Sequence, residues 1–491
     1  MGPYRYNRPV RHEEFVQRVR RHSPSTLLPL VAAASSKYSV PRSWLKSPFM
    51  KYTPWALAEV ARVSLVHGNE HRHAATERDL IECCAAFGAL TDPDLLAGHS
   101  DAFERFMLRI SSEQLSHQAP PRDELARSIA LFEQTSTARR LKVITGDWDI
   151  DLFHCSISEY VAAAFLLWAG SVPKAGFFDF NWIDNNDFHH LLEQFSMDRI
   201  RQVAETHYIA DRDEIRRRQA LISDAAHPDL RHFRFNPLDA RPVVRGMADP
   251  LLIPACGLLV RKVSQLGIFY TAMERYGANF STDLGHLFEA YVGRHLDVVT
   301  SAKVYPSFKY KVGRDRIDAV DWIVVFADVT LLVEVKAARP TEAVRIGGPG
   351  APAALKQSLA HGFEQIDRDA RAIRAQHEAF SFIAQDKPII GLVVTMEPFH
   401  VVNASVYRGE LLANPSIPIR VCSSHELERL VTIKDQTVGR VLAAYMADPH
   451  HQNSAIGPYL QHSGHVFGPN PVMDAAWVAM PWIEDREGRR E

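Results

Sequence analysis

The sequence predicts an α/β domain built around a mixed β-sheet, preceded by a mainly α-helical N-terminal region. Two patterns support this fold class. In the first half, segments such as YTPWALAEVARVSLVHG (52–68) repeat apolar residues three and four positions apart, which is the period of an amphipathic helix. After residue 281 the order becomes one helix, three strands, a second helix, and then two more strands before a short helix.

The chain of 491 residues is too long for one ordinary hydrophobic core, so we expect more than one domain. A proline-bearing stretch at 227–246, HPDLRHFRFNPLDARPVVRG, interrupts the helical pattern and indicates a boundary. We therefore expect a helical region at 1–247, which would recognise a target, bind a partner protein or self-associate. The α/β domain is expected at 248–440. Residues 441–491, rich in Pro, Gly and His, are expected to form an irregular tail.

The composition is that of a soluble globular protein, with 46% hydrophobic and 23% charged residues. A formal net charge of −2 excludes a uniformly basic nucleic-acid coat but leaves room for a local basic face. The five cysteines form no C-x-x-C pair, which favours a reducing compartment. The apolar runs are about half as long as a membrane span, so we expect a cytoplasmic protein without a membrane partner.

The α/β part begins with a predicted helix at 281–296, STDLGHLFEAYVGRHL, with Ser281 as its N-cap and Asp283 in its first turn. Three strand candidates follow at 302–312, 316–326 and 329–337. Further along, the chain predicts a helix at 354–376, strands at 387–396 and 417–422, and a short capped helix at 423–433. One face of the 354–376 helix is apolar and carries Leu355, Leu359, Phe363, Ile366 and Ile373.

Three charges stand in the stretch VDWIVVFADVTLLVEVKAAR (320–339), which otherwise reads as buried strand. If Ala327 and Asp328 form a two-residue hairpin loop, Asp321 lies directly opposite Glu334, with Cβ atoms roughly 5 Å apart. Lys336 then lies on the same face, because side chains alternate along a strand. A register slip of one residue would undo this opposition.

Two adjacent carboxylates at the edge of a core repel each other, so they are costly unless a cation lies between them. Mg²⁺ (or Mn²⁺) suits this position, because it takes oxygen ligands and commonly uses one or two carboxylates together with water and substrate phosphate. The carbonyl of Val335 could supply a further ligand. Lys336 could hold or deprotonate an attacking water. This chemistry is hydrolysis of a phosphodiester.

The stretch resembles the PD-(D/E)XK nuclease superfamily, whose restriction-endonuclease-like core has this order of elements. The resemblance covers about 281–430. Asp321 matches the first acidic residue of the motif, and EVK at 334–336 matches its E-x-K, whereas Val320 stands where the family has proline. GHLFEAYV resembles the preceding helix of the family, in which Glu289 would join the metal site. Gln365, in FEQIDRDA, resembles a glutamine that many members place near the site.

The resemblance implies a Mg²⁺-dependent endonuclease, with DNA favoured over RNA and a role in bacterial defence against phage or foreign DNA. Asp321, Glu334, Lys336 and Gln365 would be the catalytic residues, and Glu289, Asp321, Glu334 and Val335 the metal site. A basic strand nearby would contact phosphates through Lys303, Lys309, Lys311, Arg314 and Arg316.

Other interpretations of these residues stay open. Asp321, Glu334 and Lys336 could form a cross-strand ion pair on a solvated edge strand, and Glu289 and Gln365 could have surface or capping roles. The basic residues could be the solvated face of a half-exposed strand. The chain could then be a catalytically silent nucleic-acid-binding or assembly protein, and an RNA nuclease is a further alternative.

Overall fold

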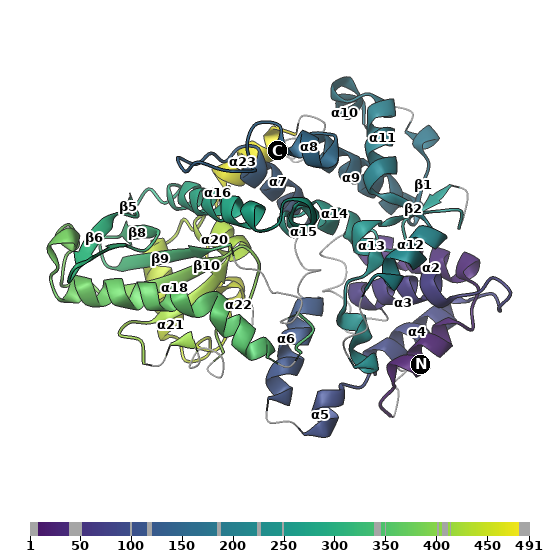
Figure 1. Ribbon diagram of the computed structural model, residues 1–491, viewed down its shortest axis with the longest axis horizontal. Helices are drawn as coiled ribbons and strands as arrows, with labels where there is room; N and C mark the ends of the chain where they lie inside the picture. The colour runs from purple at the N-terminus through teal and green to yellow at the C-terminus, as the bar shows by residue number, and fades with distance from the viewer. Residues whose placement is uncertain are drawn as a thin grey trace. The chain divides into compact units, whose positions relative to one another are not determined.

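The computed structural model describes residues 8–38, 52–98, 101–114, 120–183, 188–222, 227–247, 250–337, 345–348, 350–399, 402–404, 411–412 and 414–480 (Figure 1). The chain divides into two compact units. The first unit comprises 1–129, 145–275 and 476–491, and the second comprises 130–144 and 276–475.

This division differs from the predicted boundaries at 247 and 440. The segment after 247 stays with the first unit, because α14 (Gly257–Val263) packs against α9 (Ile157–Ser171). Most of the predicted irregular tail belongs to the second unit and contains helices, so that prediction was wrong. Pro458 and Pro471 stand in the first turns of two of these helices, where a missing N–H costs no hydrogen bond.

The first unit is mainly helical, as predicted. Its helices begin at residues suited to an N-terminus. Thr53 caps a helix that has Pro54 at its first position, and Thr76 and Ser156 each form a capping box with an acidic residue three positions later. The helices before residue 276 are α1 (His12–Val19), α2 (Pro24–Tyr38), α3 (Pro54–His67), α4 (Glu77–Gly88), α5 (Pro93–Ala97), α6 (Ala102–Gln114), α7 (Pro121–Phe132), α8 (Trp148–Phe153), α9, α10 (His189–Gln194), α11 (Met197–His207), α12 (Arg212–Ala220), α13 (Pro237–Ala240), α14 and α15 (Gln265–Tyr276).

Four short strands form a small sheet in the first unit, in the order β1-β4-β3-β2. They are β1 (Phe177–Phe178), β2 (Ile209–Asp211), β3 (Val243–Arg245) and β4 (Leu251–Leu252).

The second unit is an α/β unit around a five-stranded sheet in the order β11-β10-β9-β8-β5. The sheet is mixed, as predicted, because β9, β10 and β11 are parallel whereas β8 and β5 are antiparallel to their neighbours. Its strands are β5 (Lys303–Pro306), β8 (Trp322–Val325), β9 (Thr330–Lys336), β10 (Ile389–Thr395) and β11 (Ile419–Ser423). Its helices are α16 (Ala278–Leu296), α18 (Ala351–Arg374), α20 (Ser424–Leu430), α21 (Val438–Ala447), α22 (Ile456–His462) and α23 (Pro471–Val478), the last of which ends in the first unit.

Helices cover both faces of this sheet. Gly362 of α18 lies against Glu334 and Val393, whereas Gly293 of α16 lies against the ring of Trp322, which is paired with Val333 on the other face. The hydroxyl of Tyr291 in α16 donates to the Glu428 carboxylate of α20 at 2.7 Å, so α16 and α20 share a face. Figure 1 shows α18 lying across β9, with α16 and α20 on the other side.

The predicted helices and strands are largely present, with two differences. The apolar face predicted for α18 is buried at all five positions, namely Leu355, Leu359, Phe363, Ile366 and Ile373. However, α16 begins at Ala278 after Gly277, so Ser281 lies within the helix and is not its cap. Asp283 accordingly takes another role, described below.

The first two strand candidates each divide in two. β6 (Lys309–Val312) and β7 (Asp315–Asp318) form a separate hairpin, whereas β5 and β8 belong to the main sheet. Between the two ladders, the three residues 319–321 stand opposite the two residues 307–308. Ser307 donates to the Asp321 carbonyl and Ala319 to the Phe308 carbonyl, so the chain carries a β-bulge directly before Asp321, with Val320 as the extra residue.

Candidate active site at the start of β8

The predicted hairpin register is confirmed. Trp322 pairs with Val333 and Val325 with Thr330, and the N–H of Phe326 donates to the carbonyl of Val329 at 2.9 Å. This register places Asp321, one residue before β8, beside the end of β9 that carries Glu334 and Lys336. Only a short loop at 327–328 joins the strands, so no other register keeps their apolar faces buried.

The carboxylate of Asp321 is held by the backbone of the neighbouring strand. The N–H of Val335 donates to Asp321 Oδ2 at 2.7 Å. The sequence predicted a role for the Val335 carbonyl as a metal ligand, and that role stays a prediction. The hydrogen bond that its N–H donates to Asp321 was not predicted.

Glu334 lies deeper than Asp321, with 2% of its surface exposed. Its Oε1 accepts a hydrogen bond of 2.7 Å from the ammonium of Lys336. Its Oε2 is buried and has no hydrogen-bond partner among the described residues. A buried carboxylate oxygen without a donor is costly, so this atom is available to a ligand that brings positive charge.

Lys336 connects the strand to α18. Its Nζ donates to Gln365 Oε1 at 3.0 Å as well as to Glu334. Gly362, one helical turn before Gln365, leaves space above these side chains, because an added Cβ would lie 3.3 Å from the Lys336 Cε and 3.4 Å from the Glu334 Cγ. The structure therefore brings Asp321, Glu334, Lys336 and Gln365 to one place.

The two carboxylates are electrostatically unfavourable as they stand. Burial raises the pKa of Asp321, and the nearby charge of Glu289 raises it further. Burial also raises the pKa of Glu334, and the charge of Asp321 adds to this shift. Such shifts mean that the site lacks enough positive charge for two ionised carboxylates, which is the condition that a bound cation would relieve.

Glu289 reaches the neighbourhood from α16. Trp322 Nε1 donates to the Glu289 backbone carbonyl at 3.2 Å, which places this turn of the helix over the start of β8. Burial raises the pKa of Glu289, and Glu334 contributes to the shift. No group of three His, Cys, Asp or Glu side chains close enough to hold a metal occurs among the described residues, so a ligand role for Glu289 stays a prediction.

The bulge is supported by a buried carboxylate that the sequence analysis missed. Asp369 of α18 is fully buried, and its oxygens accept the N–H of Val320 at 2.7 Å and the hydroxyl of Tyr310 at 2.6 Å. Arg368 Nε also donates to Asp369, at 2.8 Å. The N–H of Val320 would be absent from the proline that stands here in the PD motif, so the departure from the motif supplies a hydrogen bond.

The sequence analysis also missed that the segment 130–144 belongs to the second unit, although it lies far before α16 in the chain. The buried Asp283 accepts the backbone N–H groups of Lys142, Val143 and Ile144 at 2.8, 2.5 and 3.0 Å. Burial raises the pKa of both Glu289 and Asp321, and the positive charge of Arg139 opposes both shifts. Arg139 therefore contributes positive charge to the site.

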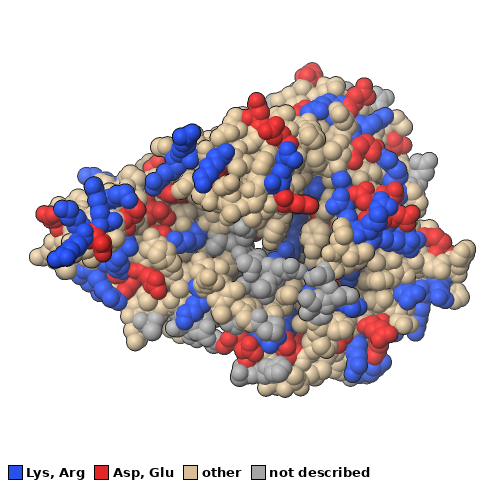
Figure 2. All heavy atoms as spheres, in the orientation of Figure 1, with Lys and Arg blue, Asp and Glu red and all other residues tan. Residues whose placement is uncertain are grey.

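The predicted phosphate-contacting residues are all exposed. Lys309 forms an ion pair of 2.9 Å with Asp318, and the hairpin also exposes Asp315, so its charge is mixed. Figure 2 shows basic side chains, with acidic ones among them, at the end of the second unit where β5 and β6 are labelled in Figure 1. The N–H of Ser307 donates to the Asp321 carbonyl at 2.8 Å, so this hairpin extends directly from the site. The predicted set is Lys303, Lys309, Lys311, Arg314 and Arg316.

Comparison with protein families, curated proteins and solved structures finds no match to this chain. In the described ranges, no helix combines the length and the hydropathy needed to cross a bilayer.

Proposed function

We propose that the second unit is a metal-dependent nuclease of the restriction-endonuclease-like kind, which hydrolyses phosphodiester bonds and prefers DNA. The observation that carries the proposal is the buried Glu334 carboxylate beside Asp321. One of its oxygens binds Lys336 and the other has no hydrogen-bond partner among the described residues. The raised pKa values of both carboxylates support the need for a cation.

The donor set fits Mg²⁺ or Mn²⁺, because hard divalent cations prefer carboxylate and carbonyl oxygens and keep several waters. Asp321 and Glu334 would hold the ion, with the Val335 carbonyl and Glu289 as further candidates. Such an ion supplies a Lewis acid that polarises a phosphoryl oxygen and lowers the pKa of a bound water.

The remaining residues act on the water and the substrate. The Lys336 ammonium, held by Glu334 and Gln365, would position the water and stabilise the negative charge that develops on the phosphoryl oxygens. The water would give up one proton to the solvent as its oxygen forms a bond to phosphorus. The bond from phosphorus to the leaving sugar oxygen, a deoxyribose oxygen in DNA, would break, and that oxygen would take up a proton from the solvent. The exposed basic residues of the hairpin would contact the flanking phosphates.

A second candidate function is a catalytically silent nucleic-acid-binding protein. The observation that favours it is the position of Lys336, whose ammonium is already bound to two acceptors within the protein. In that case the cluster would stabilise the sheet, and the basic hairpin alone would act on nucleic acid.

Cleavage assays separate these functions. Plasmid, single-stranded DNA and RNA are incubated with Mg²⁺ or Mn²⁺ and with wild type, Lys336→Ala or Arg440→Gln. Arg440 is a suitable control because it is exposed and pairs with Asp328 in the turn of the same hairpin. We expect metal-dependent DNA cleavage by wild type and control, and a loss of at least about 100-fold in Lys336→Ala.

Failure to cleave any nucleic acid with either metal would overturn the nuclease proposal, and binding without cleavage would favour the silent protein. Cleavage of RNA but not of DNA would mean that the protein is an RNA nuclease.

A further inference from the structure

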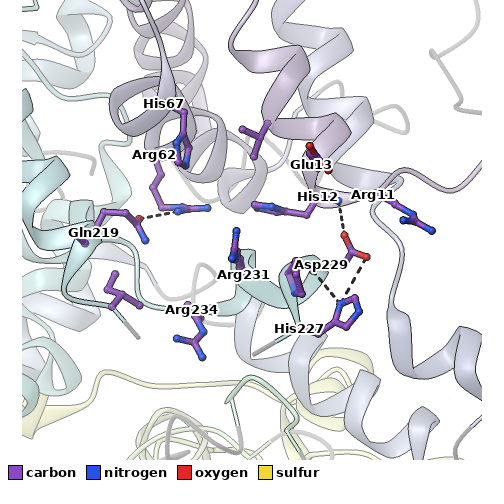
Figure 3. A pocket seen from close by; sticks show the side chains of 14 residues that line it. Arg11, His12, Glu13, Arg62, His67, Gln219, His227, Asp229, Arg231 and Arg234 are labelled. Carbon is purple, nitrogen blue, oxygen red and sulfur yellow. Dashed lines mark hydrogen bonds and ion pairs between the residues drawn. The ribbon is translucent and has the colours of Figure 1, made fainter. Parts of the chain in front are cut away.

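The first unit contains a cavity of about 730 Å³ that is separate from the candidate nuclease site. It lies between α1, α3, the end of α12 and the 3₁₀ helix η4 (Pro228–Phe233). Its volume is in the range of cavities that hold small organic ligands, which is roughly 300–1,000 Å³. Figure 3 shows the Arg62 and His12 side chains pointing toward one another, with Arg231 pointing to the space between them from η4.

Arg62 is a fixed cation in the wall of this cavity and is 5% exposed. Its Nε donates to Glu59 Oε2 at 2.6 Å, one Nη2 N–H donates to Glu59 Oε1, and Nη1 donates to Gln219 Oε1 at 2.8 Å. A guanidinium has five N–H donors, so two of them have no acceptor among the described residues. Donors that are already oriented bind an acceptor at a smaller entropic cost.

His12 supplies a second buried donor or acceptor in the same wall. The residue is 5% exposed, and its Nε2 makes no hydrogen bond within the described parts of the chain, although Glu59 Oε1 lies 3.7 Å away. A buried ring nitrogen without a hydrogen bond is unfavourable unless a ligand or water satisfies it. Arg62 and His12 therefore present unused polar atoms to the cavity from two different helices.

The charges around the cavity favour an anion. Four arginines line it, namely Arg11, Arg62, Arg231 and Arg234, against the carboxylates of Glu13 and Asp229. Asp229 is already engaged, because it accepts the His12 backbone N–H at 2.8 Å and lies 3.8 Å from His227. Among these described side chains, with the Glu59 carboxylate behind the wall included, the four arginines outnumber the three carboxylates by one.

His67, at the end of α3, also lines the cavity, and its pKa is sensitive to the positive charge around it. Partial burial lowers its pKa to about 4, and the charges of Arg62 and Arg20 add to this shift. A neutral imidazole can donate or accept a hydrogen bond without adding charge to the cavity.

We propose that this cavity binds the phosphate group of a small organic phosphate, such as a nucleotide. A phosphate offers several oxygens to arginines from more than one element, and a guanidinium matches its geometry with paired N–H donors. The cavity volume leaves room for the organic part of the ligand. This proposal is independent of the nuclease proposal, because none of its residues belongs to the second unit.

Calorimetric titration tests the proposal with inorganic phosphate, pyrophosphate, adenosine monophosphate, ATP, citrate and a short DNA oligonucleotide. The variant Arg231→Gln/Arg234→Gln is compared with Arg217→Gln/Arg245→Gln, which removes the same charge from residues outside the cavity. We expect saturable binding of at least one small phosphate. Its affinity should fall at least about tenfold in the cavity variant and stay unchanged in the control.

Absence of saturable binding by every small phosphate would overturn the proposal, as would equal affinity in the two double variants. Equal binding of citrate would overturn the assignment to phosphate, and binding of the oligonucleotide alone would make the cavity part of a nucleic-acid surface. NMR titration of His67, assigned with His67→Gln, gives a second readout in the wild-type protein. A bound phosphate should raise its pKa, and an unchanged pKa at saturation would place the ligand elsewhere.

Discussion

The backbone N–H of Val335 donates a 2.7 Å hydrogen bond to Oδ2 of Asp321. This interaction joins the bulge before β8 to the strand that carries Glu334 and Lys336. It also orients one carboxylate oxygen and leaves the other for a ligand. The geometry of the proposed metal site therefore depends on the bulge and on the residues that support it.

Val320→Pro and Asp369→Asn test this support. Proline removes the N–H that donates to Asp369, and asparagine removes the charge that Arg368 and Tyr310 contact. We expect each change to lower the free energy of unfolding by about 1–3 kcal/mol, because buried polar groups are left without partners. Urea denaturation measures the decrease. Unchanged stability in both variants would mean that Asp369 does not hold the bulge.

Asp321→Asn should stabilise the protein when no metal is present. The pKa of Asp321 is higher in the folded protein than in the unfolded chain. The free energy of unfolding therefore decreases as the pH rises above the pKa of the unfolded chain, and the decrease is complete once the pH exceeds the pKa of the folded protein. The melting temperature of metal-free wild type should therefore fall more than that of the variant from about pH 5 to about pH 8. Mg²⁺ should restore the melting temperature in wild type only. A larger fall in the variant would contradict the proposed electrostatics.

Gly362→Ala should slow cleavage without lowering the thermal stability of the protein. Alanine is the better helix former by roughly 0.5–1 kcal/mol, but its Cβ would lie 3.3–3.4 Å from Lys336 and Glu334. We expect an unchanged or higher melting temperature together with slower cleavage. Gly285→Ala in α16 is a matched control, because nothing lies within 4 Å of its added Cβ. Equal activity of the two variants would show that the space above Lys336 is not used.

The exposed basic residues of the β6–β7 hairpin should bind DNA by contacting its backbone phosphates. Substituting Lys311, Arg314 and Arg316 with glutamine should weaken DNA binding equally for different sequences. It should also reduce the slope of log affinity against log salt by about 0.9 for each phosphate that the variant no longer neutralises. Fluorescence anisotropy at several salt concentrations measures this slope, with Arg440→Gln as the control. An unchanged slope would assign the hairpin to another role.

Local pattern was sufficient to predict the centre of this site. The hairpin register follows from one short loop and from the need to bury alternate residues, so the opposition of Asp321 and Glu334 could be worked out from residue numbers. Lys336 was predicted to lie on the same face as Glu334, because side chains alternate between the two faces of a strand. Gln365 was predicted only from its resemblance to a glutamine of the nuclease superfamily, and its amide oxygen accepts a hydrogen bond from Lys336.

Long-range interactions could not be predicted in this way. The bulge arises because the pairing register of β5 with β8 differs by one residue from that of β6 with β7. Each pair alone has a regular sequence pattern, so the sequence does not show this difference. Asp369 reads as a polar residue on a long helix, although its position three residues after the buried Ile366 is a signal. Arg139 belongs to the segment 130–144, which is held to α16 by the hydrogen bond from the Lys142 N–H to Asp283, a residue 141 positions further along the chain.

Anomalous diffraction from crystals soaked in Mn²⁺ tests the central claim most directly. If Asp321 and Glu334 share a cation, a manganese peak should lie within about 2.5 Å of an oxygen of each carboxylate. The Glu334 Oε2 atom should then be one of its ligands, and the peak should disappear in Asp321→Asn. A fully occupied manganese site elsewhere, with no peak between these two carboxylates, would contradict the proposed metal centre.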